Sequence, residues 1–114
     1  MCHCSQCRKA TGTAFGTWAL VPKDEFRFTS GTERIGEFRS SDHATRMFCK
    51  DCGTTLGNLT TRRPDFFHLA VGTLDVTPPL NIILHVYAGS KAAWYEIRDD
   101  TPRHDTEPTP QRKE

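Results

Sequence analysis

The chain has 114 residues, 36% of them hydrophobic and 25% charged, and its formal net charge at pH 7 is +1. That balance argues against a dedicated nucleic-acid binder, which usually carries a basic stripe, and no apolar run approaches the roughly 18 residues of a membrane-spanning helix. The length fits a single domain of ordinary size.

Short strands separated by glycine and proline are predicted along most of the chain. A short helix comes first, near residues 5–12, and Gly12 is expected to end it. Strands are predicted over residues 15–21, 25–29, 64–72 and 81–89, because these stretches are rich in aromatic and β-branched residues or alternate along the chain. Strands do not alternate with helices, so we expect a mostly β domain of short antiparallel strands rather than a parallel sheet.

The end of the chain differs in composition from the rest. After Ile97 the apolar residues stop, and the remaining stretch is charged and rich in proline. We therefore predict a domain over residues 1–98 and an extended or disordered tail over residues 99–114.

Five cysteines fall in two clusters: Cys2, Cys4 and Cys7 at the start, and Cys49 with Cys52 in the middle. The N-terminus lacks a basic segment followed by an apolar one, so no secretory signal is expected and the location is predicted to be cytoplasmic. In a reducing compartment, close cysteine spacing indicates metal binding or catalysis rather than disulfides.

Spacing alone leaves two arrangements of zinc ligands open. The Cys-x-x-Cys pairs Cys4–Cys7 and Cys49–Cys52 could share one structural four-cysteine site, which is the commoner pattern and leaves Cys2 spare. Alternatively, Cys2, Cys4 and Cys7 could hold a zinc ion from one loop, with its fourth position open to water or an incoming thiolate.

The cysteine motifs stand within longer blocks, namely "CHCSQCRKATG", "FGTWALV", "FRSSDHATRMFCKDCGTTL", "VGTLD" and "HVYAGSKAAWYEIRDDTPRHD". With these blocks in this order, the sequence resembles the glutathione-dependent formaldehyde-activating enzyme family, also called the Gfa or centromere-protein-V domain. The resemblance implies an Mss4-like, mostly β fold with two zinc ions. It also implies a carbon–sulfur lyase of the S-(hydroxymethyl)glutathione synthase type that acts on glutathione or a similar small thiol. The alternative is a non-catalytic, zinc-stabilised β domain that binds a thiol ligand or a protein partner.

Carried over from the family, Cys2, Cys4 and Cys7 match the three ligands of the catalytic-type zinc, and Cys49 and Cys52 match half of a structural zinc site. The other half in the family is an earlier Cys-x-Cys pair, whereas only Met1 precedes Cys2 here. Three explanations stay open: a start assigned too late, a short variant with a free pair, or ligands borrowed from the first cluster or another protomer. The last of these makes a homodimer one arrangement.

Four further residues are candidates for binding the substrate. Arg8 and Lys9 directly follow Cys7, where they could offset thiolate charge and hold a carboxylate of glutathione, although a solvated turn explains them equally well. Lys91 could pair with an anionic substrate or form a surface ion pair. His85 could act as a proton shuttle or substrate donor near the zinc, or bond to the backbone at a strand edge.

The sequence also predicts where three other side chains with rings lie. His3 is predicted to be exposed, because the side chains of adjacent residues usually diverge. Trp18 and Trp94 are predicted to belong to the core or to a cleft wall, since large aromatic residues dominate small cores.

Overall fold

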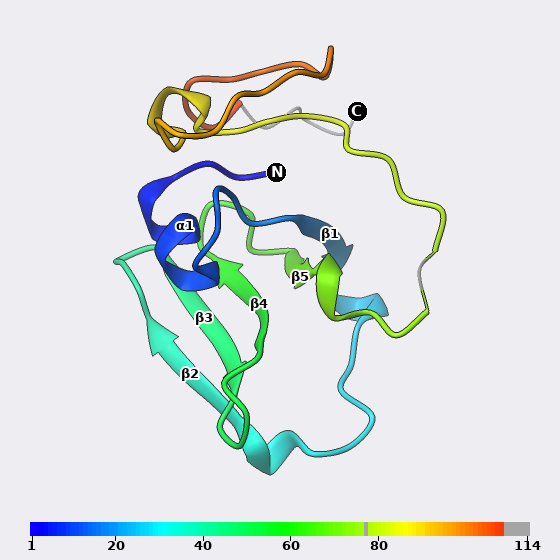
Figure 1. Ribbon diagram of the computed structural model, residues 1–114. Coiled ribbons are helices and arrows are strands. Elements are labelled where there is room, and N and C mark those ends of the chain that lie inside the picture. The colour runs from blue at the N-terminus through cyan, green and yellow to red at the C-terminus, as the bar shows by residue number, and fades with distance from the viewer. Residues whose placement is uncertain (77, 109–114) are drawn as a thin grey trace. The chain divides into compact units, whose positions relative to one another are not determined.

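The computed structural model describes residues 1–76 and 78–108, which fall into two compact units. The first unit joins Met1–Gly16 to the part of the chain from Pro78 onward, and the second unit begins at Thr17. Figure 1 shows the elements along the chain.

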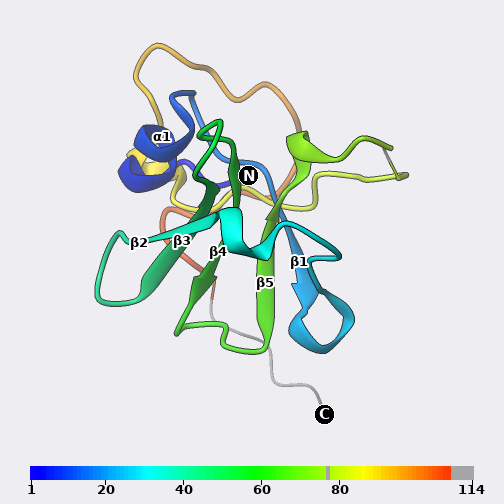
Figure 2. The ribbon, with the colours of Figure 1, turned by 90° about the horizontal axis from the view of Figure 1, so that it is seen from below.

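The second unit is a five-stranded antiparallel sheet, ordered β1-β5-β4-β3-β2 (Figure 2). Strands β2 to β5 form a meander, in which each strand pairs with the next one along the chain. Strand β1 pairs with β5 and forms the edge of the sheet opposite β2. The bounds are Trp18–Pro22 for β1, Ile35–Arg39 for β2, Ala44–Cys49 for β3, Thr55–Thr60 for β4 and Phe66–Ala70 for β5. The predicted mostly β class with short antiparallel strands is confirmed, and β1 and β5 overlap the strands predicted over residues 15–21 and 64–72.

The buried centre of this unit is Phe67 on β5, which is 3% exposed. Phe26 stacks on its ring with centroids 4.3 Å apart, and Phe28 meets the same ring edge-on at 6.1 Å. A side chain at Gly57 of β4 would overlap the Phe67 ring, so only glycine lets the two strands approach this closely.

The predicted strand over residues 25–29 is wrong. Residues 23–25 form a 3₁₀ turn, and Phe26 and Phe28 follow it outside any strand. Their alternation arises because both rings pack toward Phe67, with no neighbouring strand to form a ladder.

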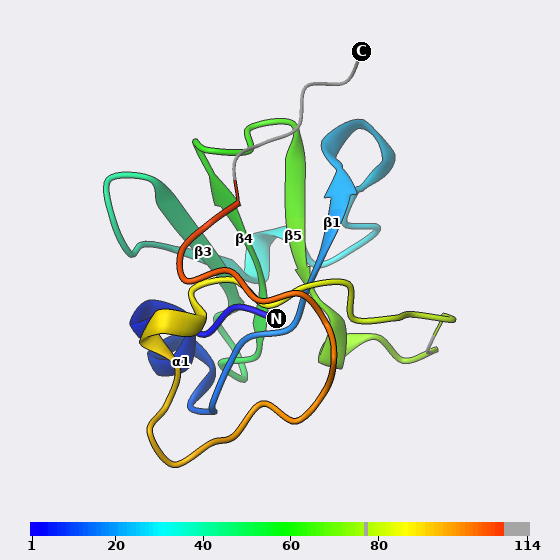
Figure 3. The ribbon, with the colours of Figure 1, turned by 90° about the horizontal axis from the view of Figure 1, so that it is seen from above.

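The first unit contains the helix α1, Ser5–Thr11. Gly12 ends it in the left-handed conformation, with φ of 65°, and its N–H donates to the carbonyl of Arg8. The predicted helix and its glycine stop are therefore confirmed. A short 3₁₀ turn, η4 (Ala88–Ser90), belongs to the same unit and is drawn in yellow in Figure 3.

The predicted strand over residues 81–89 is also wrong. Within it, Val86 forms an isolated bridge with Cys2, and His85 forms another with Arg103. Ile83 is 75% exposed. The alternating pattern lacks the continuous strand partner that would make it a strand, because each bridge involves a single residue pair.

Part of the predicted tail is hydrogen-bonded to this segment. The N–H of His85 donates to the carbonyl of Pro102 at 2.8 Å, and the N–H of His104 donates to the carbonyl of His85 at 2.9 Å. The predicted boundary at residue 98 stays a prediction, and residues 109–114 of the predicted tail lie outside the described residues. Across the described ranges, the helices are too short and too polar to traverse a bilayer.

Candidate metal centre

Three cysteines converge at the start of the first unit. The sulfur atoms of Cys2, Cys4 and Cys7 all lie within 4.8 Å of one another. Cys2 and Cys7 are buried, and Cys4 is half-buried. No fourth histidine, cysteine or carboxylate among the described residues belongs to this group. The sequence cluster thus becomes a compact set of three thiols.

Backbone pairing and helix capping hold the three thiols in place. The N–H of Cys2 donates to the carbonyl of Gly16 at 2.8 Å, and the N–H of Gly16 donates back at 3.0 Å. Cys4 is the N-cap of α1, where its Sγ accepts a hydrogen bond from the N–H of Cys7 at 3.3 Å. The Cys-x-x-Cys spacing therefore coincides with the first turn of a helix, which turns both sulfurs to the same side.

The electrostatics of the cluster favour one negative charge at Cys4. Hydrogen bonds from the thiols of Cys2 and Cys7, together with backbone N–H groups at the start of α1, lower the pKa of Cys4. Hydrogen bonds to Cys4 and Cys7, and burial, raise the pKa of Cys2. Three thiolates this close repel one another, so full deprotonation requires a cation.

The three thiols fit a zinc ion. Thiolates at about 2.3 Å from a tetrahedral zinc lie about 3.8 Å apart, and the separations here are at most 4.8 Å. A small closure of the loop would bring all three sulfurs to ligand distance. Soft sulfur donors also bind zinc in preference to magnesium or calcium.

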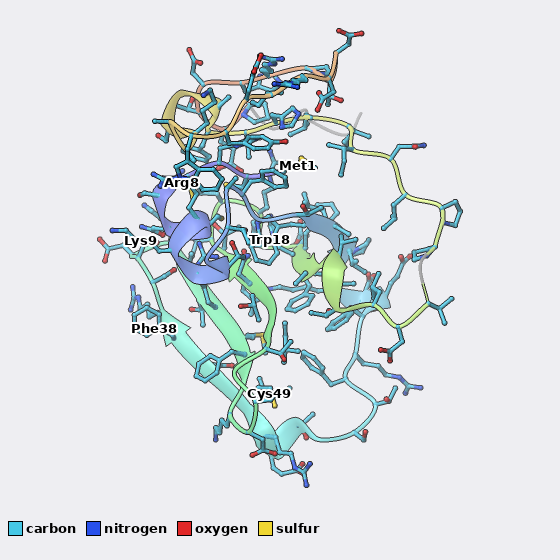
Figure 4. All side chains as sticks on the ribbon, in the orientation of Figure 1. Met1, Arg8, Lys9, Trp18, Phe38 and Cys49 are labelled. Atoms are coloured by element: carbon cyan, nitrogen blue, oxygen red, sulfur yellow. The ribbon has the colours of Figure 1, made fainter. Side chains whose placement is uncertain are left out.

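Cys49 and Cys52 lie in the second unit and are not members of the three-thiol group. Cys49 ends β3 and is labelled in Figure 4, and Cys52 is exposed in the following turn. The Sγ of Cys52 is 3.0 Å from the hydroxyl of Thr54, a contact that lowers the pKa of Cys52. Gly53, with φ of 77°, follows Cys52 in the left-handed conformation, and its N–H donates to the carbonyl of Cys49 at 2.8 Å. Their role as zinc ligands stays a prediction.

Two histidines of the first unit are in direct contact. Nε2 of His3 is 2.9 Å from Nδ1 of His85, and both residues are fully buried. The prediction that His3 is exposed is wrong, because Phe15 and His85 cover its ring, with centroids at 5.2 and 5.1 Å. Nε2 of His85 in turn lies 3.0 Å from Oδ1 of Asp99, a partner that sequence reasoning missed.

Comparison with known proteins supplies the family. The family model described as glutathione-dependent formaldehyde-activating enzyme matches residues 1–90. The chain belongs to this family.

Curated relatives are similar in sequence, and a solved structure is similar in fold. An uncharacterized lyase of Schizosaccharomyces pombe is 40% identical over 55 residues, which cover 48% of this chain and 38% of that protein. A Podospora anserina protein named "Putative glutathione-dependent formaldehyde-activating enzyme" is 32% identical over 68 residues, covering 60% and 32%. The chain thus matches about a third of the length of these relatives. A crystallised Rhodobacter sphaeroides protein supports the fold, with a TM-score of 0.58 and 23% identity over 68% of this chain and 69% of that one.

The candidate substrate-binding residues of this family member have different surroundings. Arg8 and Lys9 are both on α1, as Figure 4 shows, and Lys9 is exposed. Nε of Arg8 is buried and lacks a hydrogen-bond partner among the described residues. Nζ of Lys91 donates to the carbonyl of Tyr95 at 2.9 Å, so it bonds to backbone rather than to a carboxylate. The substrate-binding roles of these three residues stay predictions.

The tryptophans lie in different environments. Trp18 on β1 is half-buried, whereas Trp94 is 75% exposed. Trp94 lines an open hollow together with Tyr95, Glu96, Arg98 and Asp99. It is therefore a wall residue and not part of a core.

Proposed function

We propose that this chain handles glutathione or a similar small thiol at a zinc ion held by Cys2, Cys4 and Cys7. The reaction class is that of a carbon–sulfur lyase of the S-(hydroxymethyl)glutathione synthase type. The observation that carries the proposal is the compact three-thiol group, to which the described residues add no fourth donor. Three protein ligands are typical of catalytic zinc, whereas structural zinc is usually closed by four. Family membership supports the choice of thiol and aldehyde.

The chemistry requires little beyond deprotonation and positioning. A zinc ion held here would lower the pKa of an incoming thiol while leaving its sulfur nucleophilic. The substrate sulfur attacks the formaldehyde carbon, a C–S bond forms, and the carbonyl oxygen becomes a hydroxyl by taking up a proton. The thiol's own proton balances that step. Because thiols add to formaldehyde readily, holding the two reactants together can account for the acceleration.

Residues of this chain shield the sulfurs from water, hold the donors in place and supply positive charge. Burial of Cys2 and Cys7 keeps water away from two of the three sulfurs. The N-cap hydrogen bond to Cys4 and the paired backbone at Cys2 fix the donor set before metal arrives. Arg8 and Lys9 follow Cys7 on α1, where they supply positive charge for the carboxylates of glutathione.

Exchange between glutathione and its hydroxymethyl adduct tests this function. In mixtures of glutathione and formaldehyde, the exchange rate measured by two-dimensional exchange NMR is expected to rise in proportion to the concentration of zinc-loaded protein. Metal-free protein at the same concentration serves as the control, and 2-mercaptoethanol in place of glutathione measures the preference among thiols. Equal rates with zinc-loaded and metal-free protein would refute the proposal.

A further inference from the structure

Three polar side chains of the first unit form a continuous hydrogen-bonded chain from Asp99 through His85 to His3. The contacts are 3.0 Å between Oδ1 of Asp99 and Nε2 of His85, and 2.9 Å between Nδ1 of His85 and Nε2 of His3. Both imidazoles are fully buried, whereas the Asp99 side chain is 47% exposed. The chain therefore runs from the surface to His3, the residue that separates Cys2 from Cys4.

Hydrogen-bond polarity assigns the proton at the Asp99 end of this chain. The hydrogen bond from His85 lowers the pKa of Asp99, so its carboxylate is ionised at neutral pH and can only accept. Nε2 of His85 therefore donates to it. Nδ1 of His85 faces Nε2 of His3, and one proton between these two nitrogens joins the rings. The orientation of the His3 ring is thereby tied to Asp99 through two successive hydrogen bonds.

The other nitrogen of His3 indicates that this orientation is imposed. Nδ1 of His3 is buried and has no hydrogen-bond partner among the described residues. A buried ring nitrogen without a hydrogen-bond partner is unfavourable. The contact with His85, together with packing against Phe15, fixes the ring in spite of that cost.

We propose that Asp99 and His85 are positioning residues for the three-cysteine site. By holding the His3 ring in one orientation, they fix the backbone between Cys2 and Cys4, and so set the separation of two sulfur donors before metal binds. This rests on the proposed function only in that the cysteines bind zinc. Hydrogen-bonded partners behind metal ligands commonly contribute 10–100-fold to affinity. In this chain the hydrogen-bonded partner His85 contacts His3, which lies between two ligands, and not the side chain of a ligand itself.

Asp99→Leu is the sharpest variant, because leucine is similar in shape to aspartate but cannot accept the hydrogen bond from Nε2 of His85. Asp99→Asn is the conservative change, since the Oδ1 that accepts from the N–H of Thr101 at 3.0 Å also lies 3.0 Å from Nε2 of His85, and an amide oxygen can keep both hydrogen bonds. The matched control is Asp100→Leu, which makes the same change at the exposed neighbouring carboxylate.

The test combines two measurements on the full chain without glutathione. Nitrogen-15 NMR of the imidazoles reports their hydrogen bonds, and competition with a chromogenic chelator reports zinc affinity. We expect Asp99→Leu to shift the nitrogen resonances of His85 and His3 and to lower zinc affinity by about 10–100-fold, whereas Asp99→Asn should retain most of the affinity. Asp100→Leu should leave both unchanged. His85→Gln, whose amide can donate to Asp99 and accept from His3, should retain more affinity than His85→Leu.

Each outcome decides the proposal. A zinc affinity of Asp99→Leu equal to that of Asp100→Leu would overturn the positioning role and leave the proposed function standing. Nitrogen resonances of His3 that do not change in Asp99→Leu would also overturn it. A wild-type chain that binds no zinc would overturn both proposals. If His85→Leu fails to fold, the comparison of Asp99→Leu with Asp100→Leu still decides the question.

Discussion

Replacing Cys2 by serine is expected to abolish acceleration of thiol–aldehyde exchange and to weaken zinc binding by more than about 100-fold, above the range for loss of an outer partner. Cys2 is one of three sulfurs that lie within 4.8 Å of one another, so its loss leaves two donors. A serine hydroxyl is a far poorer zinc ligand than a thiolate at neutral pH. Exchange NMR and chelator competition measure the two effects.

The fold should survive this change, because serine has nearly the shape of cysteine and the backbone pairing of Cys2 with Gly16 is retained. Circular dichroism checks that point. The matched control is Cys52→Ser, an exposed cysteine in the second unit, which should leave the exchange rate unchanged. Wild-type exchange rates in Cys2→Ser would mean that the three-thiol group is not the active site.

Replacing Phe67 by alanine is expected to lower the free energy of unfolding by about 3–5 kcal/mol. The side chain is 3% exposed, and the rings of Phe26 and Phe28 both pack against it. Its removal would leave a cavity between β5 and the extended segment that carries those two rings. Urea titration followed by circular dichroism measures the loss.

Phe38→Ala provides the control for this stability effect. Phe38 lies on β2, is labelled in Figure 4 and is 62% exposed, so the same truncation should cost only about 0.5 kcal/mol. Equal losses for the two variants would show that Phe67 does not centre the core of the second unit.

Some elements could be predicted because the signal is local. The helix α1 ends at Gly12, a residue that favours the left-handed conformation, and the sequences of β1 and β5 are rich in aromatic and β-branched residues. The hairpin of β2 and β3 was missed, since β3 is half-buried along its whole length and therefore shows no alternation. The segment 81–89 has the alternation without the partner strand, which no local pattern can reveal.

The candidate site could likewise be predicted only in part. The grouping of Cys2, Cys4 and Cys7 follows from spacing, because a helix N-cap and the residue three positions later face the same side. The chain from Asp99 to His3 could not be predicted, since His3 and His85 are 82 positions apart in the sequence. His85 and Asp99 both lie in the block "HVYAGSKAAWYEIRDDTPRHD", but nothing in that block indicates that their side chains are in contact.

Zinc K-edge X-ray absorption, recorded on protein with one zinc per chain before and after glutathione, tests the central claim most directly. A catalytic-type site made by Cys2, Cys4 and Cys7 predicts three sulfur neighbours and one lighter neighbour, changing to four sulfurs when glutathione is added. Four sulfurs before glutathione, with no change after it, would contradict the open site and indicate a closed structural centre.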